Sequence, residues 1–74
     1  MLDRITWDPA MMNGQPCIRG MRLTVRRVVG AVAAYPDRSE LYRNYPDLEA
    51  EDVRQALEFA AANIADEGAA VPAI

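Results

Sequence analysis

The spacing of apolar residues predicts a first helix over residues 25–34. Four valines recur at intervals of three and four positions, which places them on one helical face: Val25, Val28, Val29 and Val32. The opposite face carries Arg26, Arg27 and Gly30. Thr24 is the expected N-cap, and Tyr35-Pro36 ends the helix because a residue before proline avoids the helical conformation.

Two more helices are predicted after this one. Asp37 and Glu40 stand three positions apart, the pattern of a capping box, and predict a short helix through about Tyr45. Its buried side is expected to consist of Leu41, Tyr42 and Tyr45. A tight turn over residues 45–48 leads to a third helix over residues 50–62. Its apolar stripe is the most regular in the chain and is formed by Val53, Ala56, Leu57, Ala60, Ala61 and Ile64.

The N-terminal third has a different pattern. Residues 4–8 alternate between polar and apolar and include β-branched and aromatic members, which predicts a short, half-buried strand. Residues 9–20 are expected to form an ordered loop, because they contain the helix breakers Pro9, Asn13, Gly14 and Pro16. Arg22–Thr24 is a candidate second strand.

Together these elements predict a mainly α fold, with a small three-helix, helix-turn-helix core and one or two short N-terminal β-strands. We expect the domain to cover residues 1–62. Residues 63–74 lose the helical periodicity and are expected to form a flexible tail. The order of the helices does not decide the function, since many three-helix bundles never bind DNA.

The chain has 74 residues, one cysteine and no histidine, which limits its chemistry. Cys17 has no partner for an internal disulfide, and the commonest general base and metal ligand is missing. We therefore expect no enzymatic activity, no metal and no cofactor. No apolar run approaches the ~20 residues of a membrane span, so a cytoplasmic protein is expected. A second subunit would stabilise so small a domain, which favours a homodimer.

The net charge of −3 hides an asymmetry along the chain. Residues 1–43 carry seven arginines and four acids, a balance of +3, whereas residues 44–74 carry one arginine and seven acids, a balance of −6. Residues 9–36 contain no acid, and their guanidinium groups are suited to binding phosphates. The candidate DNA-binding residues are therefore Arg19, Arg22, Arg26 and Arg27.

Each of these arginines also has a simpler interpretation. Arg19 and Arg22 are alternatively structural, bonding to loop carbonyls or pairing with Asp8, and Arg26 and Arg27 are alternatively ordinary solvated charges. If the four do bind DNA, a strand near Arg22 that pairs across a dimer would present them as a β-ribbon.

The third helix is a less favourable surface for DNA. Only Arg54 and Gln55 in its first turns are suited to reading bases. The same region carries four acids that phosphates would repel: Glu49, Glu51, Asp52 and Glu58. We therefore do not expect the standard docking of a helix-turn-helix.

One segment carries a resemblance to a known family. Gly14-x-Pro16-Cys17-Ile18-Arg19-Gly20-x-Arg22 resembles the motif of a widespread bacterial family catalogued as domain of unknown function 433. The likeness covers about residues 4–62 and extends to Ile5, Asp8-Pro9, Val25, Tyr45-Pro46, Leu48, Asp52-Val53-x-x-Ala56-Leu57 and Ala60-Ala61.

The resemblance implies a homeodomain-like fold and an antitoxin. Members of this family often look like antitoxins paired with PIN-like nuclease toxins, so this protein is expected to neutralise a ribonuclease by binding it and to repress its own operon through DNA. The chain departs from the family pattern at Met21, where Thr is usual, and at Gln15, where Lys is common. It also has Glu49-Ala50 where Thr-Pro commonly opens the third helix, and glutamate is a poor N-cap.

Two regions are candidates for binding a protein partner, and the tail is the candidate for the nuclease. The tail combines small apolar residues with two acids that suit a basic substrate groove, and its candidate residues are Asp66, Glu67, Val71 and Ile74. Trp7 is the candidate anchor outside the tail, because tryptophan is enriched at binding hot spots. The alternatives are a frayed terminus and a core tryptophan. For the protein as a whole, the alternative is a protein-interaction or dimerisation module that binds no DNA.

Overall fold

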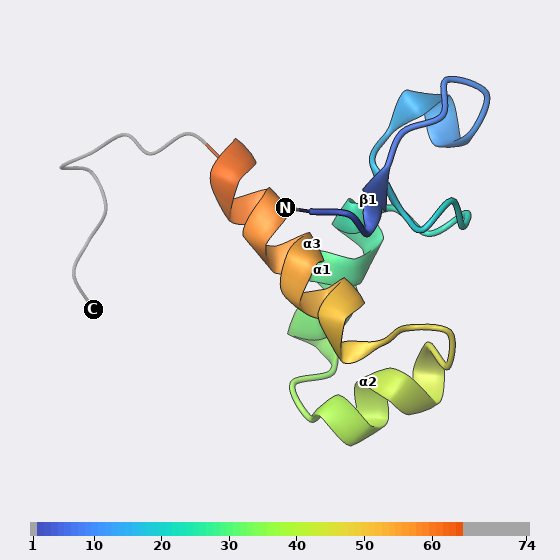
Figure 1. The fold of residues 1–74 in the computed structure, drawn as a ribbon. Coiled ribbons are helices and arrows are strands. Elements are labelled where there is room, and N and C mark those ends of the chain that lie inside the picture. The colour runs from blue at the N-terminus through green and yellow to red at the C-terminus, as the bar shows by residue number, and fades with distance from the viewer. Residues whose placement is uncertain (1, 65–74) are drawn as a thin grey trace, which may run out of the picture.

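The computed structural model describes residues 2–64 and shows three helices and a short two-stranded sheet (Figure 1). In chain order the elements are β1 (Ile5–Thr6), the 3₁₀ turn η1 (Met12–Gly14), β2 (Cys17–Ile18), α1 (Val25–Ala34), α2 (Arg38–Asn44) and α3 (Ala50–Asn63). Helices α1 and α3 pack against each other, and α2 lies at the end of this pair remote from the sheet (Figure 1). The predicted mainly α fold with a small three-helix core is confirmed.

The sheet confirms the first predicted strand in a shorter form. β1 covers two residues of the predicted five and pairs antiparallel with β2, with Ile5 opposite Ile18 and Thr6 opposite Cys17. The Thr6 hydroxyl accepts a hydrogen bond from the N–H of Gly20 at 2.8 Å, which ties the end of the sheet to the following turn.

The second strand predicted at Arg22–Thr24 is wrong, because β2 lies at Cys17–Ile18 and Thr24 makes only one isolated bridge, with Cys17. Residues 23–25 run back beside β2, and the pairing ends there because α1 begins at Val25. Arg19 and Gly20 have φ angles of 45° and 70°, a left-handed conformation that turns the backbone at once.

Helix α1 begins and ends where predicted. The Thr24 hydroxyl accepts a hydrogen bond from the N–H of Arg27 at 3.0 Å, and this N-cap bond satisfies a donor of the first turn. The N–H of Tyr35 still bonds to the carbonyl of Ala31, and the helix stops before Pro36. The two valines nearest the core, Val25 and Val28, are buried, and the other two, Val29 and Val32, are partly buried.

The other two helices also follow the prediction, with different caps. Asp37 caps α2 by accepting a hydrogen bond from the N–H of Ser39 at 2.9 Å. Glu49 occupies the N-cap position of α3, and its own N–H donates to Oδ2 of Asp52 at 2.9 Å. The carboxylate of the third helical residue therefore organises this helix end, which explains how a glutamate serves where a Thr would be the stronger cap.

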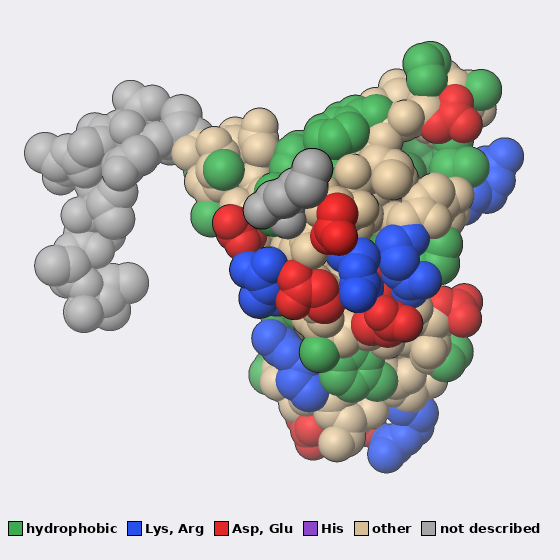
Figure 2. All heavy atoms as spheres, in the orientation of Figure 1, with side chains coloured by type: hydrophobic (Ala, Val, Ile, Leu, Met, Phe, Trp, Pro, Cys, Tyr) green, Lys and Arg blue, Asp and Glu red, His purple; other side chains and the backbone are tan. Residues whose placement is uncertain are grey.

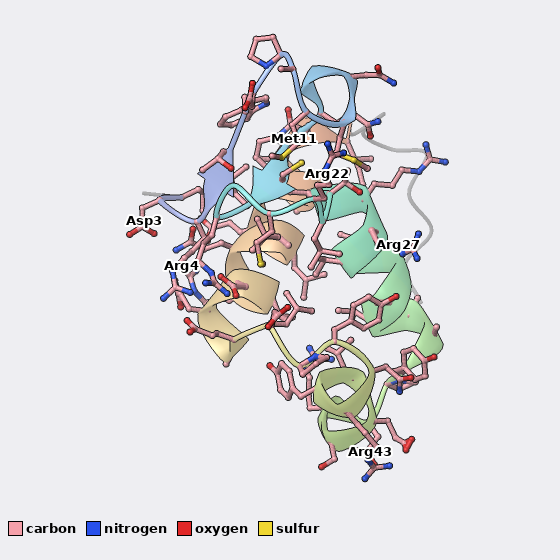
Figure 3. All side chains as sticks on the ribbon, turned by 90° about the vertical axis from the view of Figure 1, so that its right-hand side faces the viewer. Asp3, Arg4, Met11, Arg22, Arg27 and Arg43 are labelled. Atoms are coloured by element: carbon pink, nitrogen blue, oxygen red, sulfur yellow. The ribbon has the colours of Figure 1, made fainter. Side chains whose placement is uncertain are left out.

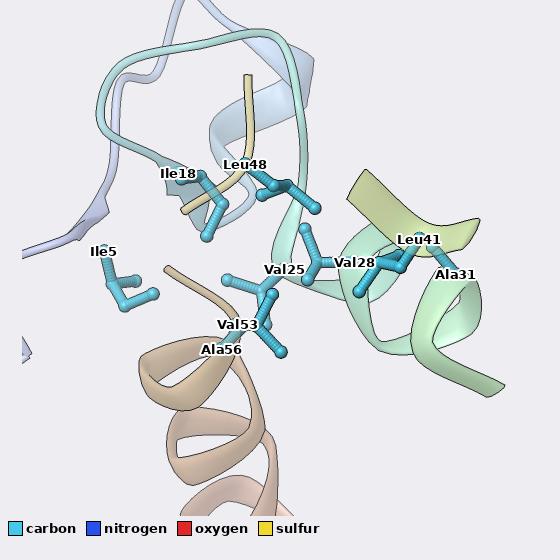
Figure 4. Packing of buried hydrophobic residues seen from close by; sticks show 9 residues of the cluster. All are labelled: Ile5, Ile18, Val25, Val28, Ala31, Leu41, Leu48, Val53 and Ala56. Atoms are coloured by element: carbon cyan, nitrogen blue, oxygen red, sulfur yellow. The ribbon is translucent and has the colours of Figure 1, made fainter. Parts of the chain in front are cut away.

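Nine buried apolar side chains form one core between the sheet and the helices (Figure 4): Ile5, Ile18, Val25, Val28, Ala31, Leu41, Leu48, Val53 and Ala56. The predicted stripe of α3 is buried only in its first half. Ala61 and Ile64 were placed in that stripe and are exposed. Ala60, Asn63 and Ile64 at this end of α3 instead line a surface groove that they share with α1.

A buried carboxylate joins the N-terminal segment to α3. Asp52 has no exposed surface and accepts four hydrogen bonds. Arg19 donates Nε to Oδ1 at 3.0 Å and Nη2 to Oδ2 at 2.9 Å, and Arg4 donates Nη1 to Oδ1 at 2.8 Å. Nη2 of Arg19 also reaches the carbonyl of Asp47 at 2.7 Å. In Figure 2 this region appears as a row of alternating basic and acidic side chains over the first turns of α3.

Gln55 adds a second link between the same segments. Its Oε1 accepts a hydrogen bond from the backbone N–H of Arg4, and its Nε2 donates to Asp3 and Glu51, all at 2.8 Å. Every buried side-chain nitrogen and oxygen of the described residues has a hydrogen-bond partner. The polar interior is therefore fully satisfied, as a stable fold requires.

The surroundings of Asp52 hold it in the ionised form. Burial raises the pKa of Asp52, but hydrogen bonds from Arg19, Arg4 and the N–H of Glu49 outweigh burial and hold the pKa below its ordinary value of 3.8. A carboxyl group whose pKa is lower in the folded state stabilises the fold above its unfolded pKa. That contribution is lost as the pH falls through the folded value.

We predict that Asp52→Asn lowers the free energy of unfolding at neutral pH by roughly 3 kcal/mol or more, because two guanidinium groups lose a buried counter-charge. Urea unfolding followed by circular dichroism measures this. Asp47→Asn is the matched control, since it makes the same change on an exposed side chain and should alter stability by less than about 0.5 kcal/mol. Stability should also fall more steeply below about pH 4 in the wild type than in Asp52→Asn. Equal stabilities of the two variants would contradict the role of Asp52.

Candidate functional site

Three of the four predicted DNA-binding arginines share one exposed surface, which we call the arginine face: Arg22, Arg26 and Arg27. Arg22 precedes α1, and the other two lie in its first turn. All three are exposed, and none forms an ion pair with another residue between 2 and 64. Figure 3 shows Arg22 and Arg27 on the α1 side of the molecule, away from Asp3 and Arg4. Their charges are available to a ligand.

Two hollows on the arginine face each contain Arg27 and a second of its arginines. The larger hollow, of about 530 Å³, lies beside α1 and is lined by Thr24, Arg26, Arg27, Gly30, Tyr35 and Tyr45, among others. The smaller, of about 220 Å³, contains Arg22 and Arg27 and is again bordered by Tyr45. The rings of Tyr35 and Tyr45 meet edge-on, with centroids 6.5 Å apart. Guanidinium and phenol groups around a shallow hollow are suited to contacting a phosphate backbone.

Tyr45 is the residue of this surface that the sequence prediction missed. The apolar stripe of α2 assigns it to the buried side, and in the structure it is half-buried and borders both hollows. Periodicity predicts which face of a helix a tyrosine occupies but not how much of its ring stays exposed at the edge of that face.

Arg19 does not belong to the arginine face. Its guanidinium bonds to Asp52 and to the carbonyl of Asp47, and the hydrogen bond with Asp52 raises its pKa above the ordinary value. The alternative partner, Asp8, instead accepts a hydrogen bond from the N–H of Ala10 at 2.9 Å. Of the two interpretations of Arg19, the geometry favours the structural one. Arg22 makes no such side-chain bond to another described residue.

The polar residues of α3 that are suited to reading DNA bases are already engaged. Arg54 donates Nη2 to Glu51 at 2.7 Å and Nη1 to Glu58 at 2.7 Å. The hydrogen bonds from Arg54 and then Gln55 lower the pKa of Glu51 to about 2, so this carboxylate stays charged at neutral pH. Gln55 is only 3% exposed. Helix α3 therefore presents fixed negative charge, which disfavours docking in the major groove.

A second surface is apolar. A groove of about 320 Å³ runs between α1 and the last turns of α3, and we call it the apolar groove. Its apolar walls are Pro16, Val25, Val29, Phe59, Ala60 and Ile64. Trp7 is not one of its lining residues, but its ring meets that of Phe59 edge-on, with centroids 5.6 Å apart. Trp7 is 58% exposed, which places it at the surface as an interface residue would be.

The structure gives less information on the remaining candidate residues. Asp66, Glu67, Val71 and Ile74 lie outside the described residues. Cys17 is buried beside β1, and its Sγ lies 3.4 Å from the carbonyl oxygen of Gln15, to which it donates. Within residues 2–64 no three side chains of metal-binding type come together, and no helix there is long and apolar enough to cross a membrane.

Comparison with known proteins agrees with the resemblance. Residues 5–60 match the family model described as "Protein of unknown function (DUF433)". The chain is also 36% identical over 59 residues to the uncharacterized protein y4eO of Sinorhizobium fredii (strain NBRC 101917 / NGR234). That match covers 80% of this chain and 27% of the relative, so the chain spans about a quarter of the relative's length. No solved structure matches the chain significantly. Because the family model covers well over half of its residues, the chain belongs to the DUF433 family.

Proposed function

We propose that this protein is the antitoxin of a type II toxin–antitoxin pair. It binds and neutralises a PIN-like ribonuclease, and it represses its own operon by binding DNA through the arginine face. The antitoxin role is supported by the resemblance on which the family assignment also rests. The role in DNA binding is supported by one structural observation: the three exposed arginines of the arginine face lie together, and none has an acidic partner within residues 2–64.

The contrast between helices α1 and α3 favours this mode of DNA binding. The first turn of α1 offers two arginines, a third precedes it, and the hollows between them are bordered by tyrosine rings. The first turns of α3 offer Glu51 and Glu58, and their one arginine is bound to both. Phosphate neutralisation provides most of the sequence-independent affinity for DNA, so the α1 side is the favourable surface.

The acidic residues are concentrated in a different part of the chain from the arginine face, and the nuclease is proposed to bind that part. Residues 44–74 have a net charge of −6, whereas the arginine face is wholly basic. A ribonuclease needs a basic groove for its substrate, and an acidic segment complements such a groove electrostatically. One small chain can therefore offer a basic surface to DNA and an acidic segment to a nuclease.

We predict that the triple variant Arg22→Ala, Arg26→Ala, Arg27→Ala fails to retard a DNA fragment from upstream of its own gene. The loss of three phosphate contacts should reduce the slope of log affinity against log salt by about 3. Gel retardation over a salt series measures both effects, and circular dichroism checks that the helices are intact.

The matched control is the triple variant Arg38→Ala, Arg43→Ala, Arg54→Ala, which removes the same charge from exposed positions elsewhere. It should retard DNA with a nearly unchanged salt slope. Equal retardation by both triple variants would exclude the arginine face. If the wild-type protein itself does not bind DNA at low salt, the protein-interaction module without a DNA role is the better description.

We predict that co-expression with the adjacent open reading frame, followed by purification through a tag on this chain, yields a stoichiometric complex with a small nuclease. Deletion of residues 66–74 should abolish protection of RNA by this chain, because the proposed inhibitory carboxylates are lost. The milder variant Asp66→Asn, Glu67→Gln separates charge from the apolar tail residues. Undiminished neutralisation by the deletion variant would reject the tail as the inhibitory element.

A further inference from the structure

The larger hollow of the arginine face contains a glycine that the fold does not require. Gly30 lies in the interior of α1, one helical turn after Arg26 and Arg27, and it lines the same hollow. It is exposed, and a Cβ added at this position would meet no neighbouring atom within 4 Å. Glycine inside a helix is destabilising relative to alanine, because it loses more backbone freedom on folding. The packing of the described residues therefore gives no reason for glycine at this position.

Two tyrosines form another part of the wall of this hollow. Tyr35 follows the end of α1 and Tyr45 follows the end of α2, and both are half-buried. Neither phenol hydroxyl forms a hydrogen bond with another of residues 2–64. A tyrosine hydroxyl is a donor that contacts phosphate oxygens in protein–DNA complexes. The hollow therefore combines unpaired guanidinium groups, unpaired phenol donors and bare helix backbone.

We propose that the larger hollow binds the sugar–phosphate backbone of one DNA strand, with Gly30 at the point where that strand comes nearest to α1. The inference rests on the proposed function, and it adds which part of the DNA is contacted and which residues besides the arginines contact it. Arg26 and Arg27 neutralise phosphates, and Tyr35 and Tyr45 donate hydrogen bonds to phosphate oxygens. Glycine permits such a close approach of a ligand to the helix backbone.

A helix presents these arginines, and not the β-ribbon expected from the sequence. The N–H of Ile18 donates to the carbonyl of Leu23 at 2.9 Å, so the segment around Arg22 already runs beside β2 of its own chain. This segment leads directly into α1 at Val25, which leaves too few residues for a strand across a dimer. The β-ribbon therefore loses its basis. Figure 3 shows Arg22 and Arg27 near the start of α1.

The first test adds the same side chain inside and outside the hollow. Gly30→Gln should weaken gel retardation of DNA by about tenfold, because the new side chain occupies the place of the strand. It should also raise the melting temperature by about 3 °C, since glutamine is the better helix former, and unfolding then does not explain the loss. Ala33→Gln is the matched control, at an exposed position of α1 that does not line the hollow. It should retard DNA as the wild type does.

The second test removes a donor without adding bulk. Tyr45→Phe keeps the ring against Tyr35 and should weaken retardation by about tenfold, as expected for a lost hydrogen bond to a charged group. Tyr42→Phe is the matched control, because Tyr42 is a half-buried tyrosine of α2 that lines neither hollow. Contacts to the DNA backbone carry no sequence information, so both losses should be equal on the upstream fragment and on unrelated DNA.

The outcomes separate this inference from the proposed function. A wild-type protein that retards no DNA at low salt would overturn both. If the wild type binds DNA and the triple variant of the arginine face does not, unchanged binding by Gly30→Gln or by Tyr45→Phe overturns this inference alone. Losses confined to the upstream fragment would also overturn it, because they indicate contacts to base edges.

Discussion

A carboxylate without exposed surface determines how the parts of this small domain fit together. Asp52 lies in the first turn of α3 and receives guanidinium groups from Arg4 and Arg19, which are 48 and 33 positions away in the chain. An unpaired charge in the interior is far more costly than an unpaired charge at the surface. The segment before β1, the turn after β2 and the start of α3 must therefore reach their places together.

Ion pairs divide the arginines of the described residues into two groups, paired and unpaired. Two arginines neutralise Asp52, and others on α2 and α3 pair with glutamates of their own helix. The exposed pairs within helices contribute little to stability, but they cancel charge. The positive charge that remains near the start of α1 belongs to Arg22, Arg26 and Arg27. Arg38 on α2 is also exposed and unpaired within residues 2–64, so three of the four unpaired arginines of this segment lie on the arginine face.

Short sequence patterns predicted the bounds of the helices well. They did not predict contacts between residues that are far apart in the chain. Thr24, the valine spacing and Pro36 sufficed for the exact bounds of α1, because caps and breakers act within a few residues. The burial of Asp52 had no such signal. In the sequence Asp52 stands beside Glu49 and Glu51 and resembles any other acid at a helix N-terminus. Only its hydrogen bonds to Arg4 and Arg19 in the folded chain distinguish it. Arg19 had two interpretations for the same reason.

The family motif around residues 14–22 is explained mainly by the fold. Cys17 and Ile18 are buried in β2, and Gly20 turns the chain in a left-handed conformation. Arg19 adopts a positive φ of 45°, a strained state for a residue with a side chain, and its bonds to Asp52 offset that cost. Of the motif residues, Arg22 alone contributes to the arginine face. The motif therefore specifies mainly how the chain folds, and Arg22 at its end is exposed beside Arg26 and Arg27 of α1.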